Sequence, residues 1–167
     1  MDTITLKRID TLHPKLRDEV KAIYQEICDR LTNKSVVCRF TSTYRTFAEQ
    51  NAVYAQGRTD KTKPIVTMAK GGESLHNYGL AIDVCLILNG VTASWDFKKD
   101  FDQDGVADLM EVIQVFKNHG WEWAGNWATF KEFPHVQKSF GYSVKQLQAL
   151  PKFKQDNFDY PVIEQVV

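Results

Sequence analysis

The chain has 167 residues, a length that suits one domain with a continuous core and room for a cleft. Hydrophobic residues make up 43% and charged residues 25% of the sequence, as in an ordinary soluble globular protein. Lysine plus arginine equals aspartate plus glutamate at 21 each, and this neutral balance argues against a nucleic-acid-binding surface or strong attachment to an anionic membrane.

The amino-terminal segment and the cysteines indicate where the chain is made. MDTITLKRIDTLHPKLRDE has no basic stretch followed by an apolar one, so we expect synthesis in the cytoplasm without a signal peptide. No apolar run approaches the roughly 18 residues that span a bilayer, so we expect no stable membrane insertion. Cys28, Cys38 and Cys85 show no C-x-x-C spacing, and we expect reduced, mostly buried thiols.

The first half of the chain contains two helical patterns around a short strand. Apolar residues recur with helical spacing over 14–31, and the β-branched segment 35–41 predicts a strand. A second helix is expected over 46–56, ended by Gly57. The polar residues 57–75 predict a long loop, and long loops in compact domains are often functional.

The second half alternates short strands with helices. Residues 81–88 are typical of a buried strand, and the dipeptide Asn89-Gly90 is a strong hairpin turn signal. The pattern further predicts a helix over 106–118, strands over 121–123 and 134–137, and a short helix over 143–150. Since repeats and linkers are absent, we expect one domain over 1–167 with an α+β fold, in which helices pack on one side of a small antiparallel sheet. The tail 151–167 has no predicted role.

Two histidines and one aspartate form a candidate zinc site. Catalytic zinc is held by three protein ligands that offer imidazole nitrogen or carboxylate oxygen, and His76, Asp83 and His135 meet that count. Asp83 lies in an apolar strand, where an unpaired carboxylate is costly and requires a cation or several donors. A single histidine is more often a hydrogen-bonded structural residue, which is how we interpret His13 and His119.

A zinc site that hydrolyses an amide also requires a base and a group that stabilises negative charge. Glu132 precedes His135 by three residues, and Pro134 restricts the backbone between them, so Glu132 is a candidate to activate water and protonate the leaving amine. Arg45 is a candidate oxyanion stabiliser, because a guanidinium stays charged and binds oxyanions in a fork.

At these residues the sequence resembles a known family. The patterns S-x-H-x-x-G-x-A-x-D and E-x-x-H are the signature of the zinc D-alanyl-D-alanine carboxypeptidase and L-alanyl-D-glutamate endopeptidase family, which has a hedgehog-like fold. The segment TSTYRTFAEQNAVYAQGRT is similar to the family's substrate-binding segment and GWEWAGNW to the region before E-x-x-H, so the likeness covers about residues 40–137. The matching signature residues are Ser74, His76, Gly79, Ala81, Asp83, Glu132 and His135.

The resemblance implies a role for each candidate residue. It implies His76, Asp83 and His135 as zinc ligands. It implies Glu132 as general base and acid, and Arg45 as oxyanion stabiliser. The substrate contacts that we expect beside them are Gln50, Ser74 and Trp123.

The resemblance also implies a reaction and a place of action. The implied reaction is hydrolysis of the L-alanyl–D-glutamate bond in peptidoglycan stem peptides, by a monomer without a separate cell-wall-binding domain. Short family members without a signal peptide resemble phage endolysins, so we expect holin-dependent release through a membrane lesion onto the cell wall. Two alternatives stay open: a D-alanyl-D-alanine carboxypeptidase or dipeptidase that uses the same site, and a non-catalytic zinc- and calcium-binding module. A glycan-cutting lysozyme would leave the two histidines unexplained.

A twelve-residue acidic segment, 100–111, is typical of an EF-hand calcium loop. Carboxylates fall at positions 1, 3, 5, 9 and 12, a backbone carbonyl is available at position 7, and Gly105 at position 6 allows the sharp turn. Ala107 departs from the usual pattern, no partner EF-hand is present, and a solvated acidic loop is the alternative. Because packed carboxylates repel one another, we expect calcium to order residues 92–112 and to couple them to the zinc site. The expected ligands are Asp100, Asp102, Asp104, Val106, Asp108 and Glu111.

Overall fold

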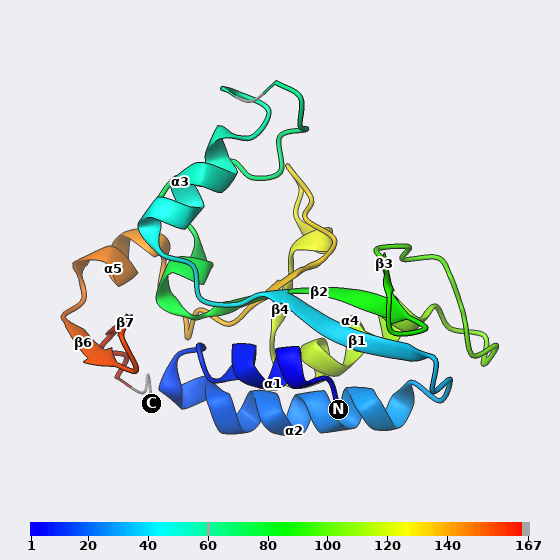
Figure 1. Ribbon diagram of the computed structural model, residues 1–167. Helices are drawn as coiled ribbons and strands as arrows, with labels where there is room; N and C mark the ends of the chain where they lie inside the picture. The colour runs from blue at the N-terminus through cyan, green and yellow to red at the C-terminus, as the bar shows by residue number, and fades with distance from the viewer. Residues whose placement is uncertain (60, 165–167) are drawn as a thin grey trace.

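The computed structural model describes residues 1–59 and 61–164, and the strands of this part form one five-stranded antiparallel sheet and one two-stranded sheet. The strands are β1 (Val36–Ser42), β2 (Ala81–Leu88), β3 (Thr92–Ser94), β4 (Glu122–Trp123), β5 (His135–Gln137), β6 (Lys152–Gln155) and β7 (Phe158–Pro161). The larger sheet has the order β1-β2-β5-β4, and β3 also pairs with β2 (Figure 1). β2 is therefore the central strand, with β1 on one edge and both β5 and β3 on the other.

Helices lie on both sides of this sheet. The helices are α1 (Thr3–Ile9), α2 (Pro14–Arg30), α3 (Phe47–Ala55), α4 (Asp108–Asn118) and α5 (Val144–Ala149), with the 3-10 helices η1 (Leu75–Tyr78) and η2 (Ala124–Asn126). Figure 1 shows α1, α2 and α4 beneath the sheet, whereas α3 rises from the opposite side. The α+β class is confirmed, although α3 departs from the expectation that the helices share one side.

The core forms where the apolar faces of α2 and α4 meet β1. Tyr24 of α2 and Phe116 of α4 pack on Phe40 of β1, with ring centroids 5.3 and 5.9 Å away, and all three are buried. Pro14 starts α2, a position where its missing N–H has no helical partner to lose. Burial of this face leaves the upper side of the sheet free for the loops that carry the site.

Most of the expected helices and strands are present, with ends that shift by one or two residues. The predicted turn connects β2 to β3, and Asn89 (φ 50°) and Gly90 (φ 76°) both adopt the left-handed conformation that such a turn requires. The helix expected from residue 106 begins at Asp108, because residues 106–107 still belong to the preceding loop.

Several elements have no counterpart among the sequence-based predictions, among them α1 and the β6–β7 hairpin. Tyr160 of β7 is fully buried and packs on Tyr44 and His13, with ring centroids 5.6 and 5.5 Å away. His13 Nε2 also donates a hydrogen bond to the Pro161 carbonyl (3.0 Å). The tail for which no role was predicted therefore completes the core, although its residues 165–167 lie outside the described part.

Two further expectations concern membranes and thiols. Within the part of the chain that the structure describes, no helix combines the length and the apolar character needed to cross a bilayer. The three cysteines are free, with Cys38 and Cys85 buried and Cys28 half-buried, as the sequence predicted.

Candidate metal centre and cleft

The three expected zinc ligands come from a 3-10 helix and two paired strands. His76 lies in η1, whose first turn is capped by Ser74. Gly79 ends η1 with φ 68°, and a Cβ there would lie 2.6 Å from a neighbouring backbone nitrogen, so this position requires glycine. The chain then enters β2, where Asp83 lies directly opposite His135 of β5. Strand register and the capped turn therefore bring the three side chains to one place.

Their ligand atoms converge on a single point. His76 Nε2 lies 3.2 Å from Asp83 Oδ2 and 3.2 Å from His135 Nδ1. His135 Nδ1 lies 3.1 Å from Asp83 Oδ1. Ligand atoms about 2.0–2.2 Å from a tetrahedral zinc lie about 3.3–3.6 Å from one another, so the observed spacing is close to that of a zinc site.

Hydrogen bonds behind the ligands fix which ring nitrogen faces this point. His76 Nδ1 donates to the Thr43 carbonyl (2.6 Å), so its Nε2 carries the lone pair. His135 Nε2 donates to Gln137 Oε1 (3.0 Å), so its Nδ1 carries the lone pair. The Gln137 amide is itself oriented, because its Nε2 donates to Glu122 Oε2 (2.8 Å).

Two imidazole lone pairs and a carboxylate thus face one another, and only an added proton or a cation can join them. Burial lowers the pKa of His76, which favours its neutral form. Burial also lowers the pKa of His135, but Asp83, Gln137 and Glu132 together outweigh burial and raise this pKa. Burial would raise the pKa of Asp83, yet His76 and His135 hold it well below its usual value. Two nitrogens and one carboxylate oxygen are a donor set that zinc favours, so these residues fit the ion.

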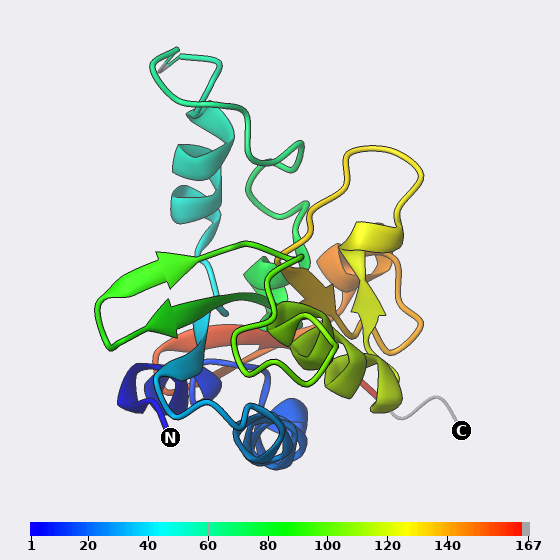
Figure 2. The same ribbon diagram turned by 90° about the vertical axis from the view of Figure 1, so that its right-hand side faces the viewer.

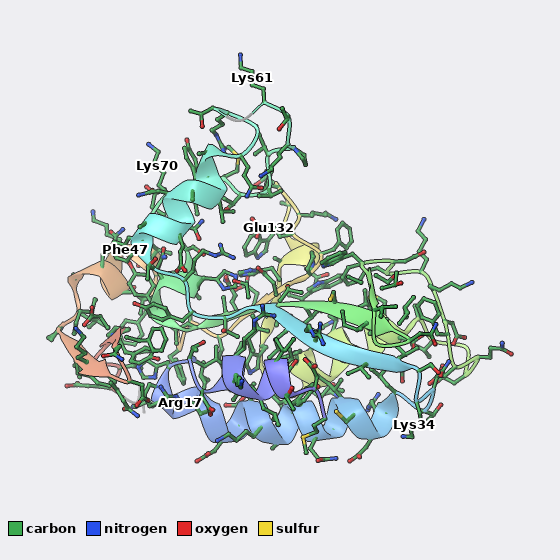
Figure 3. All side chains as sticks on the ribbon, viewed as in Figure 1. Arg17, Lys34, Phe47, Lys61, Lys70 and Glu132 are labelled. Carbon is green, nitrogen blue, oxygen red and sulfur yellow. The ribbon has the colours of Figure 1, made fainter. Side chains whose placement is uncertain are left out.

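Glu132 lies beside the three ligands, in the turn that precedes β5. Its Oε2 is 3.8 Å from His135 Nδ1, and the His135 N–H donates to the Glu132 carbonyl (3.0 Å). Burial raises the pKa of Glu132. A carboxyl whose pKa lies closer to neutral pH can both accept and return a proton during the reaction. Figure 3 places Glu132 on the side of the sheet away from α2.

Arg45 is held against Asp83 by three contacts. Its Nη2 donates to Ser42 Oγ (2.8 Å) and lies 3.3 Å from Asp83 Oδ2, while Nη1 donates to Gln50 Oε1 (2.6 Å). The guanidinium has further N–H donors, and Arg45 lines the cleft. It can therefore orient Asp83 and still donate to a substrate oxygen.

The structure gives the expected substrate contacts different access to the cleft. Ser74 lines the cleft. Gln50 is fully buried, and its Nε2 donates to the Ala69 carbonyl (2.8 Å) while its Oε1 accepts from Arg45. Gln50 is thus placed to position Arg45 through the protein interior.

Trp123 stands behind the cleft wall. Among the described residues, it is absent from those that line the cavity. Its ring stacks on Phe97 (6.4 Å, 30°) and its Nε1 donates to the Phe133 carbonyl (2.7 Å). Phe97 and Phe133 do line the cavity, so Trp123 supports the wall that they form.

A cleft of about 840 Å³ opens over the ligands. One wall comes from the end of β1, α3 and the loop that follows it, and the other from the loop after β3 and the turn before β5 (Figure 2). Large exposed side chains form its rim, a feature that sequence periodicity did not indicate because they lie in irregular loops. They are Ile65, Val66, Trp95, Phe130 and Phe133.

The acidic loop 100–111 forms a second cluster of carboxylates. Ligand atoms lie within 4.8 Å of one another in two trios, Asp100–Asp102–Asp108 and Asp102–Asp104–Glu111. Gly105 has φ 98°, as the sharp turn requires. The backbone nitrogen of Val106 donates to Asp104 Oδ1 (2.8 Å).

Several oxygens of this loop are buried without a hydrogen-bond partner in the described residues. They are Asp102 Oδ1, Asp108 Oδ1 and Glu111 Oε2. Asp108 is 0% and Glu111 7% exposed. Burial, together with Asp104, Asp102 and Asp108, raises the pKa of Glu111 to about 7. Unsatisfied buried carboxylate oxygens of this kind are costly unless a cation binds them.

The sequence of this chain is similar to those of known peptidases. A family model described as D-alanyl-D-alanine carboxypeptidase matches residues 67–138. The chain is 41% identical over 126 residues to the peptidoglycan L-alanyl-D-glutamate endopeptidase CwlK of Bacillus subtilis (strain 168), an alignment that spans 75% of this chain and 72% of CwlK.

Two solved structures share the fold. The L-Ala D-Glu endopeptidase ChiX of Serratia marcescens superposes with a TM-score of 0.52 at 21% identity, over 84% of this chain and 90% of ChiX. The vancomycin resistance D,D-dipeptidase VanXYg, in complex with a D-Ala-D-Ala phosphinate analogue, superposes with a TM-score of 0.50 at 22% identity, over 86% of this chain and 64% of VanXYg. The family model's match, residues 67–138, includes the candidate ligands His76, Asp83 and His135 and also Glu132.

Proposed function

The chain belongs to the D-alanyl-D-alanine carboxypeptidase family of metallopeptidases, and from this we propose that it hydrolyses the L-alanyl–D-glutamate bond of peptidoglycan stem peptides. The convergence of His76, Asp83 and His135 beside Glu132 carries the proposal. The identity to CwlK, which has that activity by name, favours this bond over others.

The positions of the residues support a role for each of them. We assign His76, Asp83 and His135 to hold zinc. Bound zinc supplies a Lewis acid that polarises the scissile carbonyl and lowers the pKa of water. Glu132 removes the proton from the attacking water and returns it to the nitrogen of the leaving D-glutamate. Arg45 donates a hydrogen bond to the carbonyl oxygen as negative charge develops there.

Digestion of purified peptidoglycan tests the reaction. Zinc-loaded protein is expected to release stem fragments with a free D-glutamate amine, identified by mass spectrometry, and to leave L-alanine on the glycan strand. Release of free D-alanine instead would indicate a D-alanyl-D-alanine carboxypeptidase, the alternative that uses the same ligands. No release from any wall preparation would favour the non-catalytic metal-binding module.

We also propose that loop 100–111 binds Ca²⁺. The buried oxygens without partners in Asp108 and Glu111 support this, and an all-oxygen donor set suits a hard cation. The loop contacts the segment between α2 and β1: Asp102 Oδ2 accepts from Thr32 Oγ1 (2.8 Å). Activity of zinc-loaded protein measured against free Ca²⁺ tests whether the ion regulates turnover. A flat response would restrict bound calcium to a structural role.

The cellular setting stays a prediction. We expect a monomer that acts on the cell wall without inserting into the membrane. A role as an endolysin, with holin-dependent release, follows from the resemblance alone.

A further inference from the structure

The cations of the cleft differ in whether they already have a partner. Arg45 is engaged by Asp83, Ser42 and Gln50. Lys98 and Lys131 also line the cavity, and in the described part of the chain neither ammonium lies within 4.0 Å of a carboxylate. Two positive charges are therefore available to a ligand on one wall of the cleft.

The backbone beneath Lys98 is fixed before any ligand arrives. The Lys98 N–H donates to Asp96 Oδ1 (2.9 Å), and the Asp96 N–H donates to Ser94 Oγ (3.3 Å). The ring of Phe97, the residue between them, packs on Trp123 and lies 5.7 Å from the ring of Phe133. A rigid base of this kind lowers the conformational cost of using the lysine for binding.

The position of Lys131 in the cleft is set by the residue that follows it, Glu132. Lys131 directly precedes Glu132, the residue that delivers a proton to the leaving amine. That amine belongs to D-glutamate, so the D-glutamyl side of the substrate lies on the Glu132 side of the cleft. D-Glutamate is joined through its amine to L-alanine and through its γ-carboxyl to the next residue, which leaves its α-carboxylate free beside the scissile bond.

We propose that Lys98 and Lys131 form an anion-binding wall that recognises the free α-carboxylate of the D-glutamyl residue, so that the enzyme selects stems with D-glutamate over stems with the uncharged D-isoglutamine. The inference rests on the proposed function and specifies its substrate class. Asp96 and Glu132 are the acidic side chains that share this wall, and the Oδ1 of Asp96 accepts from the Lys98 N–H. The carboxylate therefore meets two cations and two acids, Asp96, which is partly satisfied, and Glu132, which takes up the proton of the attacking water.

Two synthetic stem peptides test this proposed recognition. They differ only at the D-glutamyl residue, which carries either an α-carboxylate or an α-carboxamide. Unaltered, zinc-loaded protein is expected to prefer the carboxylate. The double variant Lys98→Gln/Lys131→Gln should lose about tenfold in kcat/KM on the carboxylate peptide, mainly through KM, as two exposed ion pairs would supply. Its kcat/KM on the carboxamide peptide should stay within about twofold.

Lys34→Gln is the matched control, because Lys34 lies at the far end of the molecule from Glu132 (Figure 3). It should match the unaltered protein on both peptides. In the unaltered protein, added salt should weaken the preference for the carboxylate peptide, because salt screens its ion pairs with the two lysines. The double variant lacks these lysines, so salt should not change its ratio of kcat/KM on the two peptides. Equal losses on both peptides, or no loss on either, would overturn the proposal.

A binding measurement separates this inference from the proposed reaction. Calorimetric titration of the γ-D-glutamyl fragment, with a free amine and either form of the α-group, requires no turnover. The carboxylate fragment should bind the unaltered protein more tightly than the carboxamide fragment, and the double variant should bind both alike. If the protein cleaved neither peptide, the proposed reaction would fail, and these affinities would still support or refute the lysine wall.

Discussion

Asp83 interrupts a strand that is otherwise apolar, and its surroundings explain why a charge is tolerated there. Its carboxylate meets His76, His135 and Arg45 within 3.3 Å. The ligand positions could be predicted from the sequence because a buried carboxylate requires such partners and because the family signature is intact. Gln137, which fixes the tautomer of His135, could not, since its amide is oriented by Glu122, which only the β4–β5 pairing brings opposite it.

At this scale the first prediction concerns Glu132. Glu132→Gln keeps the volume and the hydrogen-bonding reach of the side chain but cannot accept a proton. Turnover of stem peptide should fall by about two to four orders of magnitude while bound zinc, measured by elemental analysis, stays at the level of the unaltered protein. Glu26→Gln, on α2, is the control and should retain activity. Near-normal rates in Glu132→Gln would mean that another group is the base.

The second prediction concerns Gln137. Gln137→Met removes the acceptor behind His135 with little change in volume, so the imidazole is no longer held with Nδ1 toward the other ligands. Zinc affinity, measured by competition with a chromophoric chelator, should fall by about 10- to 100-fold. Gln25→Met, which alters an exposed amide on α2, should leave the affinity unchanged. An unaltered affinity in Gln137→Met would show that packing alone orients the ring.

At the scale of elements, α1 and the β6–β7 hairpin show where sequence patterns were insufficient. Both are too short for a clear periodicity, and contacts distant in the chain stabilise them. The hairpin depends on Tyr160, whose hydroxyl donates to the Thr11 carbonyl (3.0 Å). The helix depends on Asp2, which caps Thr5 and accepts two hydrogen bonds from Arg39 of β1. β2 was predictable because a long apolar run marks it, and α4 because its apolar residues recur on one helical face.

Asp2 supplies a prediction with a pH dependence. Burial would raise the pKa of Asp2, but hydrogen bonds from Arg39 and Thr5 lower it to about 2. A carboxyl whose pKa is depressed on folding adds stability above its unfolded pKa of 3.8 and loses it as pH falls toward 2. Asp2→Asn should therefore reduce the free energy of unfolding by about 1–2 kcal/mol at pH 7, since asparagine still caps α1 and only the charge is lost.

Urea denaturation between pH 3 and pH 7 measures this effect. About half of the difference between Asp2→Asn and the unaltered protein should be gone at pH 3. Asp10→Asn, which removes an exposed carboxylate 3.8 Å from Lys21, should change stability by less than about 0.5 kcal/mol at either pH. A difference for Asp2→Asn that does not vary with pH would place its cause in the cap and not in the charge.

At the scale of the whole molecule, the cleft is assembled from segments that are far apart in the chain. Its walls come from residues 41–76 and from residues 83–135, which meet only in the folded molecule. The acidic loop joins the second wall to the helical layer. Its Phe101 carbonyl accepts from Asn33 Nδ2 (3.0 Å), and the Asp108 N–H donates to the Lys99 carbonyl (3.2 Å). An acidic loop was expected from the sequence, but its contacts with Thr32 and Asn33, in the segment after α2, depend on the tertiary fold.

Because of these links, we expect the proposed calcium site to affect the stability of the whole molecule. At a free Ca²⁺ concentration about one hundred times the Kd, binding to the folded loop adds about 2.7 kcal/mol to the free energy of unfolding. Tm should therefore rise by about 5–10 °C when Ca²⁺ is added to zinc-loaded, calcium-free protein. Glu111→Gln should abolish the rise. In the absence of calcium the same variant should be at least as stable as the unaltered protein, because it removes a buried oxygen that lacks a partner. Asp29→Asn, an exposed change on α2, should preserve the rise. Differential scanning calorimetry at pH 7.5 decides the matter, and equal responses of Glu111→Gln and unaltered protein would mean that the ion binds elsewhere.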